Sequence, residues 1–121
     1  MLTATDDDAY NSLVCVHFIP DLGRERVLQL TPPATESGKE VRHRMLGRSP
    51  WGEAASHEEI TRAFWKGASF KVTAISENFS WDELQENTPG ALFLIYLYQG
   101  KLSVIDEFVH PPDGSKVIYL V

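Results

Sequence analysis

The chain has 121 residues, which is enough for one domain with one hydrophobic core. Hydrophobic residues make up 43% of it and charged residues 23%, values that are ordinary for globular domains and exclude a disordered composition. The formal net charge of −6 disfavours nucleic-acid partners, whose phosphates would be repelled, and fits a basic protein partner better.

The first half of the chain predicts three strands. Residues 1–10 are small, polar and acidic, so we expect a flexible arm there. Residues 13–19 are apolar at both alternating sets of positions, as in a strand covered on both faces, and Pro20 would end that strand. Residues 26–31 alternate and predict a hairpin partner, and residues 41–46 predict a third strand.

A principal helix is predicted over about 57–66. Ser56 and Glu59 have the spacing of a capping box, in which each side chain accepts a hydrogen bond from the other residue's backbone N–H. Gly67 suits the left-handed conformation that terminates many helices. The same capping spacing recurs just before a short helix that we expect near 81–86.

The last fifty residues predict four strands. Residues 70–76 alternate as a strand does. Residues 91–98 and 101–109 flank Gln99-Gly100, which is compatible with a two-residue hairpin turn because glycine tolerates positive φ. After a further turn, residues 117–121 supply a final strand, which would close a three-stranded meander.

Strands therefore outnumber helices and do not alternate with them. This order predicts an α+β fold with a mainly antiparallel sheet of about six or seven strands. The principal helix would pack on one face of that sheet. Residues 1–121 would form a single domain.

The predicted hairpin allows us to infer which side chains are neighbours, because a two-residue turn determines which residues face each other. Pairing Tyr98 with Lys101 places Leu97 by Leu102, Ile95 by Val104, Phe93 by Asp106 and Ala91 by Phe108. That face is apolar except for Asp106. If the face is the core, Asp106 is a partly buried carboxylate and a weak candidate for a catalytic group. The alternative is that the strand ends nearby and the carboxylate reaches solvent.

The opposite face of the hairpin is a candidate binding surface. It carries Tyr96 and Tyr98, whose aromatic bodies and polar tips are typical of wet contact surfaces. The alternative is that the arm or a helix covers this face. Trp51 is a second candidate, because it lies in a Ser-Pro-Trp-Gly stretch that resembles a loop with a displayed aromatic anchor.

Arg42 and Arg44 belong to the only concentrated basic stretch. In an extended strand they would point the same way about 6.6 Å apart, a spacing that suits a bound carboxylate or phosphate. A solvated edge strand, which uses charge to deter aggregation, is the simpler explanation. Asp106 would be a third option, as their partner.

Metal and thiol chemistry find little support. Cys15 is the only cysteine, so an internal disulfide is excluded, and on a strand it would lie about 6.6 Å from His17, too far for routine proton transfer. The histidines show no helical metal-ligand spacing, and the chain has no phosphate-binding glycine loop or nucleophile elbow. We therefore expect no metal and no cofactor.

The sequence favours a non-enzymatic protein-binding module that uses Tyr96 and Tyr98 or Trp51. An acidic inhibitor or immunity-type protein that neutralises a basic partner would be one such case. The alternative is a small enzyme or ligand-binding domain with a helix–sheet pocket, in which Asp106 is the acid or base and Arg42 or Arg44 holds an anionic substrate. A homodimer through residues 117–121 is a further option.

The compartment and membrane expectations follow from the same composition. No apolar run approaches the ~20 residues of a membrane-spanning helix, and the first ten residues are acidic rather than basic. We therefore expect a cytoplasmic protein with no membrane contact.

Overall fold

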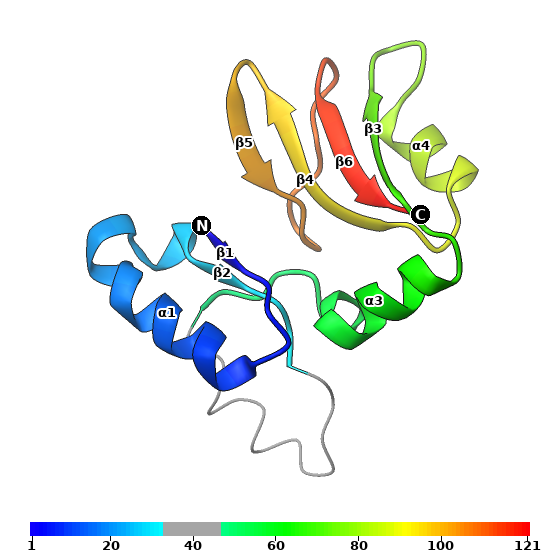
Figure 1. Cartoon of the computed structure of the whole chain (residues 1–121). Coiled ribbons are helices and arrows are strands. Elements are labelled where there is room, and N and C mark those ends of the chain that lie inside the picture. Colours follow the sequence, from blue (N-terminus) through cyan, green and yellow to red (C-terminus); the bar gives the residue numbers. More distant parts are fainter. Residues whose placement is uncertain (33–46) are drawn as a thin grey trace. The chain divides into compact units, whose positions relative to one another are not determined.

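A computed structural model of the chain describes residues 1–32 and 47–121 (Figure 1). These residues form two compact units, Met1–Arg62 (unit 1) and Ala63–Val121 (unit 2), so the boundary falls within a helix. The predicted strand 41–46 lies outside the described residues. In chain order the described elements are β1 (Leu2–Thr3), α1 (Asp8–Leu22), η1 (Arg24–Arg26), β2 (Leu28–Gln29), η2 (Glu53–Ala55), α3 (His57–Trp65), β3 (Phe70–Ala74), α4 (Trp81–Asn87), β4 (Leu92–Tyr98), β5 (Lys101–Val104) and β6 (Lys116–Leu120).

Helix α1 replaces the strand that we predicted over 13–19, and that prediction is wrong. Asp7 is the N-cap, and its Oδ1 accepts a hydrogen bond from the backbone N–H of Tyr10 at 3.0 Å. Gly23, with φ +83°, follows the last residue of the helix, and its N–H donates to the carbonyl of Ile19. Pro20 lies inside the helix, in its last turn, rather than ending the element.

The apolar pattern was misleading because α1 has almost no amphipathic character, with apolar residues distributed around the helix. Its buried residues are Asn11, Ser12 and Cys15. Leu13 is 68% exposed and Val16 is 47% exposed. The helix therefore buries polar groups, and its apolar residues carry no helical signal that points at a core.

Strands β1 and β2 form a two-stranded parallel sheet in unit 1. Leu2 faces Leu28 and Thr3 faces Gln29. The segment expected to be a flexible arm thus contains β1 and the start of α1. Where a strand was predicted over 26–31, the structure has only β2, preceded by the 3-10 helix η1.

Hydrogen bonds made by two buried polar side chains contribute to the interior of unit 1, beside the buried apolar residues Val27, Leu30 and Ala55. Asn11 is fully buried, and its side-chain amide makes three hydrogen bonds with Thr5. Gln29 is also fully buried; its Nε2 donates to the Ser12 hydroxyl at 3.0 Å, and its Oε1 accepts from the backbone N–H of Gly47 at 3.1 Å. Because each partner is satisfied, these groups can remain buried without a large desolvation penalty.

Unit 2 is built on a four-stranded antiparallel sheet with the order β3-β6-β4-β5 (Figure 1). The α+β class is therefore correct, and the expectation of six or seven strands in one sheet is wrong. The final strand does not close a meander beside β5. Instead β6 lies between β3 and β4, so it forms no edge of the sheet. The option of a homodimer that pairs through residues 117–121 therefore does not fit the structure.

The hairpin of β4 and β5 is confirmed. Gln99 and Gly100 form its turn, with φ of +49° and +77°, and Tyr98 faces Lys101 as expected. The register of β4 against β6 shifts between Phe93 and Ile95, where Leu94 is the extra residue of a β-bulge. The bulge places Phe93 on the same side as Tyr96, whereas strict alternation would have placed it with Ile95 and Leu97.

Helices α3 and α4 correspond to the two predicted helices. The Ser56 hydroxyl accepts a hydrogen bond from the backbone N–H of Glu59, and Gly67, with φ +95°, follows the end of α3. Ser80 and Glu83 form a full capping box at the start of α4. However, α3 is not the principal helix, because α1 is longer by six residues.

The core of unit 2 lies between α4 and one face of the sheet. Trp81 and Leu84 of α4 pack with Val117 and Tyr119 of β6. The ring of Phe93 is edge-on to Trp81 at 4.7 Å between centroids. Within the described residues, the indole Nε1 of Trp81 is a buried donor with no hydrogen-bond partner.

Candidate interaction surface

The sheet of unit 2 has a second face that is apolar and that α4 does not cover. Cross-strand neighbours define it in two complete rows, because directly opposed residues share a face. One row runs Val72, Ile118, Ile95, Val104, and the next runs Ala74, Lys116, Leu97, Leu102. We call this surface the open face and define it by eight apolar residues: Phe70, Val72, Ala74, Ile95, Leu97, Leu102, Val104 and Ile118. Phe70 begins a third row with Leu120 and Leu92, and this row is partly covered, because Leu120 is buried.

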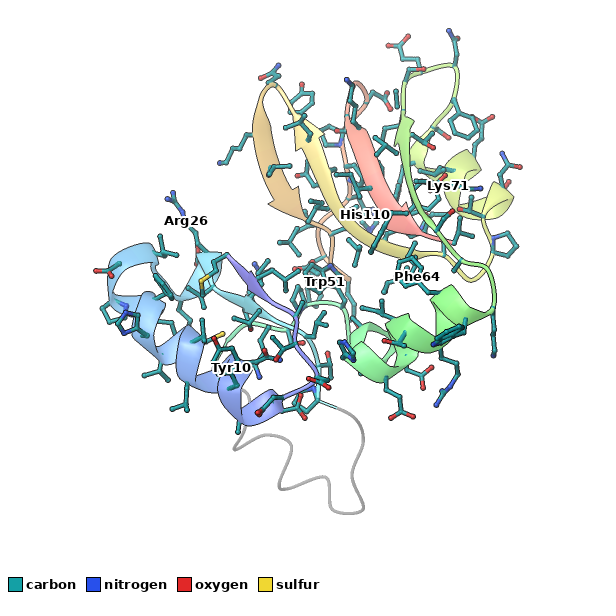
Figure 2. All side chains as sticks on the ribbon, viewed as in Figure 1. Tyr10, Arg26, Trp51, Phe64, Lys71 and His110 are labelled. Atoms are coloured by element: carbon teal, nitrogen blue, oxygen red, sulfur yellow. The ribbon has the colours of Figure 1, made fainter. Side chains whose placement is uncertain are left out.

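Several open-face side chains are strongly exposed. Val72 is 62% exposed, Leu102 61% and Phe70 55%. The ring of Phe70 meets the ring of Phe64, at the end of α3, edge-on at 5.3 Å (Figure 2). Large apolar side chains that are clustered and exposed often mark a docking site.

The size of the open face follows from strand geometry. Four strands about 4.8 Å apart and about five residues long span roughly 300 Å². Its two full rows hold one charged side chain, Lys116, at the β6 end. A patch of this size lies within the range of the largest apolar patches on ordinary monomers, which are often functional.

The structure places Tyr96 on the core side of the sheet. Tyr96 faces Val117 across β6 and packs against the cluster that includes Trp81 and Leu84. Tyr96 therefore lies on a face that a helix covers, which was the alternative to an exposed binding surface. Tyr98 lies at the hairpin end, where its hydroxyl accepts a hydrogen bond from Nε2 of Gln99 at 3.3 Å. Binding of a partner through these tyrosines stays a prediction.

Asp106 lies beyond the end of β5 rather than within it. Its Oδ1 accepts hydrogen bonds from the backbone N–H groups of Phe108 at 2.8 Å and Val109 at 2.9 Å. This arrangement stabilises the turn that follows β5. The carboxylate is half-buried, and a catalytic role for Asp106 stays a prediction.

The loop that carries Trp51 is anchored in unit 1 by Thr31. The hydroxyl of Thr31 bonds to the hydroxyl of Ser49 at 2.6 Å and donates to the carbonyl of Gly52 at 2.7 Å. Trp51 is itself half-buried between these anchors (Figure 2). The geometry gives the loop a defined shape; a binding role for Trp51 stays a prediction.

The described residues show no contact among the other candidates that they include. Arg42 and Arg44 lie outside the described residues, so their relation to Asp106 stays a prediction. Cys15 is fully buried beside the hydroxyl of Thr3 at 3.4 Å, whereas His17 is exposed on α1. Across residues 1–32 and 47–121, no three potential ligand side chains gather as a metal site would require, and no helix has the length and apolar character to cross a membrane.

Comparison with protein-family models, curated proteins and solved structures found no match to the chain. Inference about its function therefore rests on its own residues and their geometry.

The open face was missed because the sequence marks both faces of the hairpin as apolar. The residues Leu97, Leu102, Ile95 and Val104 were grouped correctly, but we treated their face as the candidate core. Which face a short helix covers is a tertiary choice that strand alternation does not encode. The available signal was the brevity of α4, because seven residues cannot cover both faces of four strands.

Proposed function

We propose that this protein is a non-enzymatic protein-binding module whose partner docks on the open face of the unit 2 sheet. The exposure of Val72, Leu102 and Phe70 on that face carries the proposal. Burial of such side chains against a partner would stabilise the complex by about 25 cal/mol for each Å² of apolar surface removed from water. Binding energy of this kind needs no reactive group.

The charge of the chain supports a basic partner. The 17 acidic residues exceed the 11 lysines and arginines, and α4 exposes Asp82, Glu83 and Glu86. Opposite net charges accelerate the encounter of two proteins, while apolar contact supplies most of the affinity. A basic protein with an apolar patch is the partner that combines both features. More specifically, we propose that the protein is an acidic inhibitor or immunity-type protein.

The enzyme alternative gains no support from the described residues. Asp106 accepts hydrogen bonds from two backbone N–H groups, and these bonds are explained by its role in stabilising the turn. Its combination with Arg42 or Arg44 remains a prediction from the sequence.

The test uses charge insertion at the open face. Tagged wild-type protein would be used as bait in lysate from its own source and eluted with a salt gradient, and the released proteins would be identified. Leu102→Lys introduces a charge on the open face, at the end of its second row on strand β5. Phe108→Lys is the matched control, because Phe108 is 89% exposed but lies outside the sheet.

We expect one stoichiometric basic protein that the wild type and Phe108→Lys retain and that Leu102→Lys loses. The purified pair should bind at least about tenfold more weakly with Leu102→Lys, since one buried leucine contributes about 1.5–3 kcal/mol. Equal retention by Leu102→Lys and the wild type would refute docking on the open face. An acidic partner would refute the charge argument alone.

A further inference from the structure

Strand β3 forms an outer edge of the sheet, and its free backbone groups have a definite pattern. Among residues 1–32 and 47–121 it pairs only with β6. Reciprocal backbone bonds join Ser69 with Val121, and the Ile75 N–H donates to the carbonyl of Ser115. Because bonded and non-bonded residues alternate along an antiparallel pair, Lys71 and Thr73 direct their backbone groups to β6. Phe70, Val72 and Ala74 therefore direct theirs outward.

This edge lacks the devices that usually protect exposed strands. The strand Phe70–Ala74 contains no proline, and its pairing with β6 shows no bulge. Its one charged residue is Lys71 (Figure 2). The three outward-directed residues also belong to the open face, where Val72 is 62% exposed. Within the described chain, the outward N–H and carbonyl groups of these residues have no partner.

The opposite edge of the sheet, strand β5, offers fewer free backbone groups for pairing with a strand of another chain. In β5, the hairpin register leaves only Leu102 and Val104 with outward backbone groups, since Tyr98 and Lys101 form the bonded pair beside the turn. Two residues later the chain enters the turn at Asp106.

We propose that β3 pairs with β3 of a second copy of this chain, antiparallel and around a two-fold axis at Val72. Only residues with outward backbone groups can form the bonded pairs, which restricts the register. With Val72 opposite its own copy, Phe70 lies opposite Ala74 of the second copy, and Ala74 opposite its Phe70. Each of these three pairs exchanges two backbone hydrogen bonds.

The side chains fit this self-pairing. The large ring of Phe70 meets the small side chain of Ala74, and two β-branched valines meet at the axis, a favourable cross-strand pair. Lys71 lies opposite Thr73 of the second copy, so no like charges face each other. An isologous contact requires this kind of self-complementarity.

Dimerisation would join two four-stranded sheets into one sheet of eight strands. A two-fold axis perpendicular to the sheet keeps both open faces on the same side, and the continuous apolar surface grows from roughly 300 to roughly 600 Å². That area approaches the ~800 Å² that each partner buries in a standard protein–protein interface. The dimer goes beyond the proposed function, since it needs no other protein.

The first experiment is sedimentation velocity of the full chain over about 5–500 μM. A five-residue strand contact is small, so we expect a reversible dimer with a Kd in roughly the micromolar range. Val72→Lys and Val72→Glu should each be monomeric, because the axis places like charges opposite one another. Mixed in equal amounts, the two variants should form a heterodimer that high salt weakens. Circular dichroism would check that each variant is folded.

The matched control is Leu102→Lys, which puts the same charge on the open face but far from β3. It should dimerise as the wild type does. Amide exchange adds a residue-level readout: the N–H groups of Phe70, Val72 and Ala74 should become protected at high concentration, while those of Lys71 and Thr73 are protected at every concentration.

A wild-type protein that stays monomeric to 500 μM would overturn the proposal, as would a dimer that survives Val72→Lys. Loss of the dimer in Leu102→Lys would point to face-to-face association and also overturn it. These outcomes can be told apart from those of the partner-docking test, which asks whether Leu102→Lys captures another protein as well as the wild type does.

Discussion

Replacing Gly47 with alanine probes the closest approach in the polar interior of unit 1. A Cβ at this position would lie 2.6 Å from the sulfur of Cys15 and 2.9 Å from Cβ of Gln29. Nonbonded carbon atoms prefer separations of about 3.5–4.0 Å, so both neighbours would have to move by about 0.6 Å or more. Both are fully buried, which leaves them little room.

The expected net cost of Gly47→Ala is about 1–3.5 kcal/mol of unfolding free energy. Overpacking of a buried site costs about 1–3 kcal/mol. Displacement of Gln29 would also weaken the hydrogen bond that its Oε1 accepts from the Gly47 N–H, which contributes about 1 kcal/mol. These costs exceed the gain of about 0.4–1 kcal/mol that an unstrained glycine-to-alanine change brings through the unfolded chain.

Urea denaturation followed by circular dichroism would measure the effect, and amide exchange in α1 and β2 would assign it to unit 1. With an m-value of about 2 kcal/mol/M, the midpoint should fall by about 0.5–2 M. In a Cys15→Ala background the sulfur is absent, and Gly47→Ala should cost at least about 1 kcal/mol less. A Gly47→Ala protein as stable as the wild type, or a cost unchanged by Cys15→Ala, would refute the proposed clash.

Three further changes test local hydrogen bonds by the same denaturation measurement. Ser80→Ala should cost about 1 kcal/mol by removing the cap of α4, and no loss would contradict the capping geometry. Asp106→Ala should cost about 1–3 kcal/mol through two lost backbone partners, whereas Asp106→Asn, which keeps an acceptor, should cost less; equal losses would count against the turn. Asn11→Ala should cost about 1–3 kcal/mol because the change removes the three bonds to Thr5, and neutrality would contradict that network.

The elements predicted correctly were those with local chemistry. The Gln99-Gly100 turn and the caps of α3 and α4 depend on residues within a few positions of each other, so the hairpin register and both helices could be derived. Helix α1 failed that test because its buried side is polar and apolar content was taken as evidence of a strand. Asp7 was the unused signal, since an aspartate before an apolar run is a typical N-cap.

The candidate surface was less accessible to prediction, because it depends on contacts between distant residues. Strand order placed β6 between β3 and β4, which converted β3 into an edge and removed the C-terminal edge we had expected. The bulge at Leu94 places Phe93 on the core side, and no glycine or proline at this position indicates a bulge in the sequence. Neither fact follows from alternation or composition.

The central position of β6 has a consequence for the order in which the protein matures on the ribosome. Strand β3 is synthesised before its partner β6, and within the described residues it pairs with no other strand, so neither of its edges is occupied while α4 and the β4–β5 hairpin are made. The hairpin needs only its own turn and can form meanwhile. Until Lys116–Leu120 emerge, the nascent chain carries a five-residue strand with one apolar face and two unpaired edges, an interval in which chaperone engagement or misassembly with a neighbouring chain is most favoured.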